Sequence, residues 1–313
     1  MAHADAPLDQ LPDWCARCLG SPPAEVLFRT GHLSMVVGVR LSDGREVVVK
    51  ARPPAERIAS CLRVQAHLAA GGYPAPRPIA GPAPFGQSTA TAEDHMPAGS
   101  PLAANTPEQI IACARALADL VAAAPAAADV PSLDPPPWAW PQHPGPGVWP
   151  APDDLDGDLN GRPGPVPGWL DDLGRRIRRR LGHRAGPLGV GHVDWEAQNL
   201  RWDGDGRLVA VHDWDSAATQ TEPVIAGLAA AVHTATGLPG TEATTAQAAQ
   251  FLDAYQHARR NAFDPDELRD AWAAGLCVRA FNTAKDTFRP TGASDSLALL
   301  ATHADERRHL AGL

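Results

Sequence analysis

The hydrophobic pattern of the first hundred residues predicts a small antiparallel sheet with two helices. Short apolar runs are separated by polar segments that hold Gly, Asp or Ser, a pattern typical of consecutive antiparallel strands. These runs cover residues 26–28, 35–41, 46–51 and 88–92. Apolar positions at helical spacing predict helices over residues 8–19 and 56–72, the second ended by Gly71-Gly72.

After residue 100 the apolar pattern becomes helical. The predicted helices cover residues 107–124, 169–181, 225–235, 245–259, 265–288 and 294–310. Residues 126–168 interrupt them with a segment so rich in Pro and Gly that regular secondary structure is excluded, yet it carries Trp138, Trp140 and Trp149. Because disordered linkers normally lack aromatic residues, we expect a long loop that packs through these tryptophans.

A stretch near residue 200 combines strand and turn signals. Two short apolar runs, residues 200–202 and 208–211, flank the Asp-Gly repeat at 203–206. Asp-Gly between apolar runs is a strong hairpin signal. The hairpin would bring Asn199, just before its first strand, and Asp213, just after its second strand, to the same end.

The polar residues of this stretch suit a metal-assisted phosphoryl transfer. Asn199 and Asp213 offer hard oxygen ligands to Mg²⁺, an ion that keeps several waters and needs few protein ligands. Asp194 is a separate carboxylate that would orient an attacking hydroxyl and accept its proton. Asp194 and Asp213 have apolar neighbours, where an unpartnered carboxylate is costly, whereas Asp203 and Asp205 are ordinary turn residues.

Two motifs in this stretch resemble those of a known family. HVDWEAQN, residues 192–199, resembles the His-x-Asp-x4-Asn catalytic loop of the aminoglycoside phosphotransferase and choline kinase group, relatives of the protein kinases. HDWDS, residues 212–216, resembles their metal-binding motif, and Val193 stands where the family often has Gly. The resemblance implies these roles: catalytic base for Asp194, magnesium ligand for Asn199 and Asp213, and bracing of the loop for His192.

The resemblance also implies a fold and a nucleotide. We expect an α+β, bilobal, protein-kinase-like fold, with a sheet-based N-lobe over residues 1–95 and a mainly helical C-lobe over residues 96–313. ATP or GTP would bind with Mg²⁺. Lys50, which follows three valines in a buried strand, matches the family's lysine that holds the α- and β-phosphates. The turn that contains Gly31 and Ser34 would lie over the phosphates.

Residues 93–99 have the character of the hinge between the lobes. In that case the backbone of Asp94, His95 and Met96 would face the adenine, and Met96 would pack on it. The alternative for this segment is a plain surface loop.

Two positions depart from the family pattern. The family carries a Glu on the helix after the strand lysine, but here Cys61 stands near that place and the only carboxylate of the helix is Glu56. Either Glu56 reaches Lys50, or the ion pair is absent. Pro223 is followed by Val-Ile-Ala226, so the acid that braces the catalytic loop in the family is absent as well.

Composition narrows the expected partners and location. The net charge of −9 argues against a nucleic acid partner and is compatible with a cationic substrate. The chain has no apolar run long enough to span a bilayer and its first residues lack a secretory pattern, so we expect a cytoplasmic monomer or homodimer without a membrane partner. The five scattered cysteines are expected to be reduced thiols.

These observations predict a phosphotransferase that moves the γ-phosphate of ATP or GTP to a hydroxyl of a small molecule. An aminoglycoside or another cationic antibiotic is the favoured acceptor, with choline, homoserine or a sugar as alternatives, and Asp215 and Glu196 are candidate acceptor contacts. One rival is a non-catalytic nucleotide-binding relative. Another is a metal hydrolase that uses His192 and Asp194, although no further ligand or nucleophile set accompanies them.

Overall fold

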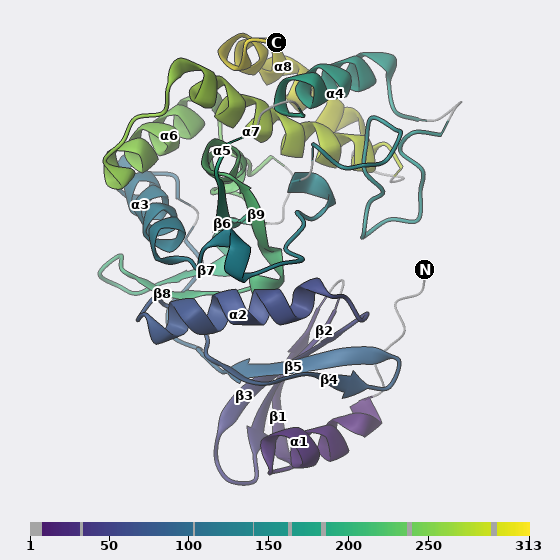
Figure 1. The fold of residues 1–313 in the computed structure, drawn as a ribbon, viewed down its shortest axis with the longest axis vertical. Coiled ribbons are helices and arrows are strands. Elements are labelled where there is room, and N and C mark those ends of the chain that lie inside the picture. The colour runs from purple at the N-terminus through teal and green to yellow at the C-terminus, as the bar shows by residue number, and fades with distance from the viewer. Residues whose placement is uncertain are drawn as a thin grey trace.

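The structure, a computed structural model, describes most of the 313 residues in two lobes (Figure 1). The described residues are 8–31, 34–102, 104–139, 141–161, 165–182, 186–236, 240–288 and 293–313. Each predicted helix and strand is present, with ends that differ by at most three residues from those expected. The α+β, two-lobed architecture is therefore confirmed, whereas the boundary between residues 95 and 96 remains a prediction.

The first lobe is a five-stranded antiparallel sheet with the strand order β1-β2-β3-β5-β4. The strands are β1 (Pro23–Thr30), β2 (Met35–Leu41), β3 (Glu46–Arg52), β4 (Pro78–Phe85) and β5 (Ser88–Asp94). Strand β3 lies in the middle, and its valines are buried because both faces of the sheet are covered. The register places Lys50 opposite Thr91 and Val48 opposite Glu93.

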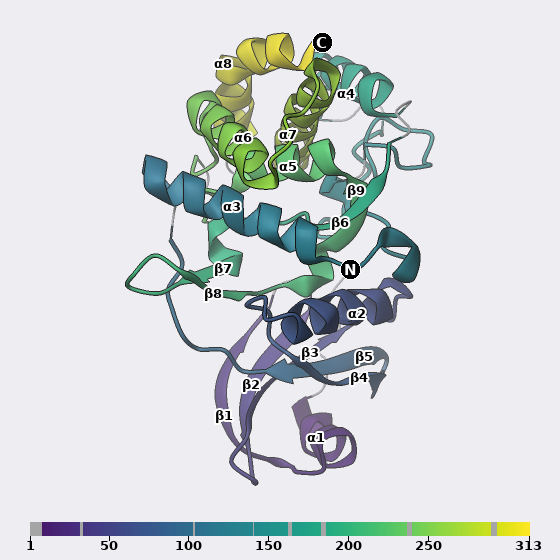
Figure 2. The same cartoon turned by 60° about the vertical axis from the view of Figure 1, so that its left-hand side comes forward.

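Helices cover both faces of this sheet, as Figures 1 and 2 show. A 3-10 turn, η1 (Leu8–Gln10), leads into α1 (Leu11–Leu19), whose Trp14 packs edge-on against Phe85 at 6.4 Å between ring centroids. On the other face lies α2 (Arg57–Ala70), between the sheet and the second lobe. Its residues Cys61, Val64 and Leu68 belong to the larger hydrophobic core, which continues into the second lobe.

The second lobe is mainly helical. Its α-helices are α3 (Pro107–Ala123), α4 (Gly168–Leu181), α5 (Glu222–Val232), α6 (Thr245–Arg259), α7 (Pro265–Asp286) and α8 (Ala293–Ala311). Short 3-10 helices are η2 (Ala127–Asp129), η3 (Pro137–Ala139), η4 (Ala197–Asn199) and η5 (Trp214–Ser216). None of the helices in the described parts of the chain has the length and apolar character needed to cross a membrane.

Two small antiparallel sheets face the first lobe. The expected hairpin joins β7 (Leu200–Trp202) to β8 (Leu208–Val211). A second pair, β6 (Leu188–His192) with β9 (Ala217–Thr221), was not expected from the sequence. Together these strands carry both motifs, because β6 ends at the first motif and η5, which belongs to the second, leads directly into β9.

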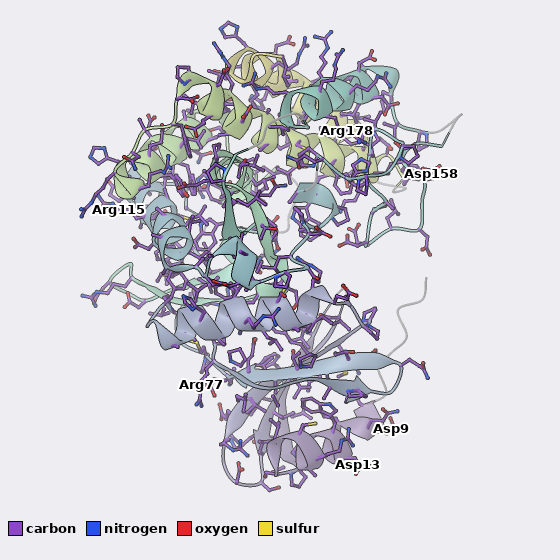
Figure 3. All side chains as sticks on the ribbon, in the orientation of Figure 1. Asp9, Asp13, Arg77, Arg115, Asp158 and Arg178 are labelled. Carbon is purple, nitrogen blue, oxygen red and sulfur yellow. The ribbon has the colours of Figure 1, made fainter. Side chains whose placement is uncertain are left out.

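The Pro- and Gly-rich segment 126–168 packs on α4 where the structure describes it. Trp149 is buried, and its indole N–H donates to the Asp171 carboxylate at 2.7 Å. Arg178 on α4 donates to the carbonyl oxygen of His143 at 3.0 Å (Figure 3). The segment is thus anchored through a tryptophan as expected, while Trp140 lies outside the described residues.

Close helix packing supports the strand that leads to the first motif. A Cβ added at Gly227 on α5 would lie 1.9 Å from the carbonyl oxygen of Ala271 on α7. The two helix backbones therefore touch at this point. On its other side α5 packs on β6, where a Cβ at Gly191 would lie 2.5 Å from the side chain of Ile225.

We expect Gly227→Ala to lower the free energy of unfolding by about 3 kcal/mol, because α5 must move away from α7 to admit the methyl group. Urea denaturation measures this change. Gly204→Ala is the matched control, since a Cβ at that exposed turn meets nothing within 4 Å. Equal stability of the two variants would show that α5 and α7 do not approach this closely.

Candidate active site

The β7–β8 hairpin brings Asn199 and Asp213 together at its open end. Leu200 pairs with Val211, and the next residue, His212, donates its backbone N–H to the carbonyl oxygen of Asn199 at 2.8 Å. Asp213 follows immediately, so the structure shows the juxtaposition that the sequence predicts. Asp203 has the expected turn role.

The backbone of Asp213 is strained. Its φ and ψ angles are 59° and 52°, the left-handed region that residues with a side chain rarely adopt. Such a conformation costs on the order of 1–3 kcal/mol and persists where the surrounding structure enforces it, often at functional sites. The buried Trp214 next to it donates its indole N–H to the carbonyl oxygen of Val211 at 2.8 Å and holds the segment in place.

Asn199 and Asp194 are linked through the Asn199 amide. The Asn199 side-chain nitrogen donates to the Asp194 carboxylate at 2.8 Å and to the Asp194 carbonyl oxygen at 3.0 Å. Its nitrogen is thus committed, which leaves the amide oxygen as the atom that can bind a cation. The link also holds Asp194 close to the open end of the hairpin.

The electrostatics of this group fit a divalent cation. Burial, and then the carboxylates of Glu196 and Asp213, raise the pKa of Asp194 well above its usual range. Burial, and then Asp215, raise the pKa of Asp213. So much negative charge in one place favours a bound cation. The described residues contain no group of three or more His, Cys, Asp or Glu arranged to hold a metal, so Asn199 and Asp213 would leave the remaining positions to water and phosphate.

His192 is buried and braces the two motifs. Its Nε2–H donates to the carbonyl oxygen of His212 at 2.9 Å, and its ring lies edge-on to Trp195 and Trp214. Burial lowers the pKa of His192 to about 4, so the ring is neutral at physiological pH. This geometry matches the bracing role and does not favour a hydrolase in which His192 takes a proton at Nε2.

Lys50 has an acidic partner, but not one that the sequence indicated. Its ammonium lies 2.8 Å from the carboxylate of Glu93, and the exposed fractions of the two side chains are 11% and 6%. Glu56 instead lies with its carboxylate 3.5 Å from the hydroxyl of Ser132 in an exposed position. Glu56 therefore does not reach Lys50, and no pair with an acid on α2 is present among the described residues. Lys50 instead pairs with Glu93 on β5, a partner that was not expected from the sequence.

Strand β5 continues further than expected and absorbs part of the predicted hinge. Glu93 and Asp94 are its last residues, since both pair with β3. Each also has a cation beside its carboxylate, Lys50 and Arg77 respectively. The Asp94–Arg77 pair is solvent-exposed. In the sequence, two acids after a run of Ala and Thr indicate the start of a loop. The cations that pair with them become apparent only from the order of the strands in the sheet.

The segment after β5 is held on both sides. His95 donates its backbone N–H to the carbonyl oxygen of Glu46 at 3.2 Å, and its ring nitrogen lies 3.1 Å from the Glu46 carboxylate. Ser100 then exchanges two backbone hydrogen bonds of 3.0 Å with Trp202 on β7. The half-buried Met96 lies between these anchors. That the backbone of residues 94–96 faces an adenine stays a prediction.

The turn after β1 requires a glycine. Gly31 has a φ of 135°, and a Cβ there would lie 1.9 Å from the carbonyl oxygen of Ser34. His32 and Leu33, which complete this turn, lie outside the described residues. The predicted contacts of Gly31 and Ser34 with phosphate therefore stay predictions.

Asp215 connects the second motif to the first lobe. Its carboxylate lies 2.6 Å from the guanidinium of Arg52 on β3. Arg57 on α2 donates to the carbonyl oxygens of Asp215 and Ala217, the latter at 2.8 Å. The contact of Asp215 with the acceptor stays a prediction; its side chain is paired with Arg52. Strand β3 and helix α2 are thereby fixed to the segment that carries Asp213.

A second buried lysine was missed in the sequence. Lys285, at the end of α7, lies 2.8 Å from the carboxylate of Asp154, and both side chains are nearly buried. The chain has 27 basic residues, and only Lys50 and Lys285 are lysines. Both are buried in ion pairs. The scarcity of lysine in a chain that otherwise uses arginine was the signal that could have identified Lys285.

Besides its pair with Asp154 in the Pro- and Gly-rich segment, Lys285 influences acids of the catalytic loop. Burial raises the pKa of Glu196 to about 7, while Gln198 and Lys285 act in the opposite direction. The positive charge of Lys285 likewise opposes the burial-driven rise in the pKa of Asp194. The charge of Lys285 therefore acts on two acids of the catalytic loop.

The chain matches the model of one protein family and shares its fold with several solved structures. The model of the APH phosphotransferase enzyme family matches residues 27–270. A search of curated protein sequences gave no match. Similar solved structures include the amicoumacin kinase hAmiN in complex with AMP-PNP, Ca²⁺ and Ami, which is 12% identical with a TM-score of 0.62 over 92% of this chain and 89% of that chain.

Two further solved structures share the fold. The choline/ethanolamine kinase family protein from Mesorhizobium loti is 14% identical, with a TM-score of 0.57 over 97% of this chain and 98% of that chain. The aminoglycoside phosphotransferase from Alicyclobacillus acidocaldarius is 13% identical, with a TM-score of 0.55 over 95% and 93%. At these identities the structures establish the fold, which is that of the protein-kinase-like small-molecule kinases. Since the family model covers most of the sequence, the chain belongs to the APH phosphotransferase enzyme family.

Proposed function

We propose that this protein transfers the γ-phosphate of ATP or GTP to a hydroxyl group of a small molecule. The observation that carries the proposal is the open end of the β7–β8 hairpin, where Asn199 and Asp213 lie together and Asn199 also holds Asp194. The similarity to a kinase bound to AMP-PNP and Ca²⁺ supports a nucleotide and a divalent metal.

In this mechanism each residue has a separate task. Asn199 and Asp213 would hold Mg²⁺, which when bound neutralises the charge of the phosphate oxygens. Lys50 would bind the α- and β-phosphates, and Asp194 would orient the acceptor hydroxyl and accept its proton. Most of the catalysis would come from positioning and charge stabilisation in a site that is already organised.

The favoured acceptor is an aminoglycoside or another cationic antibiotic. The carboxylate of Glu196 acts on Asp194, and that of Glu242 acts on Glu196, so the catalytic loop lies in negative surroundings that attract cations. The names of similar structures include aminoglycoside and amicoumacin kinases. Choline-type acceptors are the alternative, since a choline/ethanolamine kinase family protein has the same fold. Because Lys50 has Glu93 as its partner, the missing helix acid no longer favours a non-catalytic relative.

We expect Asp194→Asn to lower the rate of phosphoryl transfer by about 10²–10⁴-fold, because the hydroxyl loses its proton acceptor. Mass measurement of products from a panel of hydroxylated cationic compounds, with ATP or GTP and magnesium, tests this. Nucleotide binding should persist. The exposed acid Asp205 provides the matched control, Asp205→Asn, which should transfer phosphate at the normal rate. Unchanged transfer by Asp194→Asn would remove this residue from the mechanism.

Removal of divalent metal should stop the reaction, and added magnesium should restore it. Asp213→Asn and Asn199→Ala should each need a higher magnesium concentration for half-maximal rate, since each loses a ligand atom. The measurement is ADP or GDP formation as magnesium is varied. A chelated sample that still transfers phosphate would exclude the metal-dependent reaction.

The Lys285–Asp154 pair should affect the acceptor and not the nucleotide. We expect Lys285→Met and Asp154→Asn each to raise the KM for the acceptor about tenfold, because the loop loses its attachment beside the catalytic loop. The double variant should be no worse than the more severe single variant, since both remove the same pair.

Steady-state kinetics with each substrate varied in turn measures these effects. Arg207→Met is the control, because this cation is exposed and its ion-pair partners in the described part of the chain are turn acids. An equal rise in the KM for the nucleotide would contradict an acceptor-side role for Lys285.

A further inference from the structure

Two cations and three acids meet where the first lobe contacts the second motif. Lys50 lies 2.8 Å from Glu93, and Arg52, two residues along the same strand, lies 2.6 Å from Asp215. Asp213 has no ion-pair partner among the residues that the structure describes. Lys50 and Arg52 thus each pair with a different acid. The remaining acid, Asp213, is the one that we assign to the metal.

The pairing of Lys50 with Glu93 needs an explanation, because other acids lie close enough to Lys50 to act on its charge. Burial alone would lower the pKa of Lys50, yet Glu93, Asp215 and Asp213 together keep it above its ordinary value. A lysine ammonium is a compact charge on a flexible stem, so it moves to whichever acid is nearest. Without Glu93, its remaining partners would be the two acids of the second motif. Lys50 would then form an ion pair with Asp213, and its ammonium would point away from the phosphates.

The backbone places Glu93 where its carboxylate can prevent an ion pair between Lys50 and Asp213. Glu93 on β5 lies opposite Val48 in the register of β3 and β5, and its side chain shares a face of the sheet with Lys50. Both members of the ion pair therefore belong to one sheet. The strand register brings the two residues together, whereas a pair formed with an acid on α2 would depend on the helix for one of its members.

Helix α2 contributes an amide in place of an acid. The side-chain nitrogen of Gln65 donates to the second carboxylate oxygen of Glu93 at 2.8 Å and to the carbonyl oxygen of Pro76 at 2.7 Å. Gln65 is only 2% exposed and Glu93 5%. Each Glu93 oxygen thus has one donor, which fixes its orientation. Cys61, near the place where the family has its Glu, lies with its sulfur 3.9 Å from the carbonyl oxygen of Asp215.

We propose that Glu93, held by Gln65, is the positioning residue for Lys50 and replaces the helix acid of the family. It keeps the lysine directed at the nucleotide phosphates and leaves Asp213 to the metal. The inference rests on the proposed nucleotide-dependent function. It adds that both members of the pair belong to the sheet, and that α2 contributes the amide that orients Glu93.

Nucleotide binding tests this role without reference to the acceptor. We compare AMP-PNP with magnesium against adenosine, which lacks phosphates, by titration calorimetry on the full chain. Glu93→Gln keeps the shape of the side chain and removes its charge. We expect the Kd of AMP-PNP to rise at least about tenfold and that of adenosine to change less than about twofold, because a buried charge loses its partner. Cys61→Ala is the matched control and should bind both ligands normally.

The outcomes separate the inference from the proposed function. A wild-type protein that does not bind AMP-PNP overturns the proposed function. If the wild type binds it and Glu93→Gln binds it equally well, or if Glu93→Gln weakens adenosine to the same extent, Glu93 does not position Lys50. A loss of AMP-PNP binding in Cys61→Ala as large as that in Glu93→Gln also overturns the inference.

Thermal melting checks that each variant folds. Should Glu93→Gln not fold, Gln65→Leu provides the second route, since it removes the donor that orients Glu93 and retains an apolar side chain of similar length. We expect it to weaken AMP-PNP selectively by about threefold. In the Lys50→Ala background, Gln65→Leu should cause no further loss, because the two residues act through the same contact. An additive loss would contradict the proposal.

Discussion

The pairing of Leu200 with Val211 is the constraint on which the rest of the site depends. It sets the carbonyl oxygen of Asn199 against the amide of His212 and thereby places Asp213 beside Asn199. Each strand of the hairpin is also bonded to a preceding segment of the chain. Trp202 on β7 pairs with Ser100, and the backbone amide of Val211 on β8 donates to the carbonyl oxygen of Pro74 at 2.8 Å. The strained backbone of Asp213 is the local cost of this arrangement, and the buried Trp214 next to it helps to maintain it.

Charge is distributed around this hairpin in a way that keeps its ligand atoms available. On the side of the first lobe Glu93 pairs with Lys50 and Asp215 pairs with Arg52, while in the second lobe Asp154 pairs with Lys285. Buried charges are costly unless they are paired, so each of these cations requires its acid. The acids that we assign to chemistry, Asp194 and Asp213, take no part in these pairs. Burial, and then neighbouring carboxylates, raise the pKa of both acids, and a bound cation would favour their charged form.

The sequence was sufficient for the parts of the fold that rest on local patterns. Helices with a clear apolar face and the Asp-Gly hairpin could be predicted, because their signals lie within a few residues. The pairing of β6 with β9 could not be predicted, since the two short strands are separated in the sequence by the whole β7–β8 hairpin. The partner of Lys50 could not be predicted for a related reason: Glu93 becomes its neighbour only because β5 inserts beside β3, ahead of β4 in the sheet. The motif residues were identified by their spacing, whereas Lys285 and Asp154 depend on contacts between distant segments.

The most direct test of the central claim is a crystal structure of the protein with AMP-PNP and magnesium. We expect one metal ion bound by the side-chain oxygen of Asn199 and the carboxylate of Asp213, with the ammonium of Lys50 in hydrogen-bond contact with the phosphates and still paired with Glu93. A nucleotide bound away from the hairpin, or a metal ion that contacts neither Asn199 nor Asp213, would contradict the account.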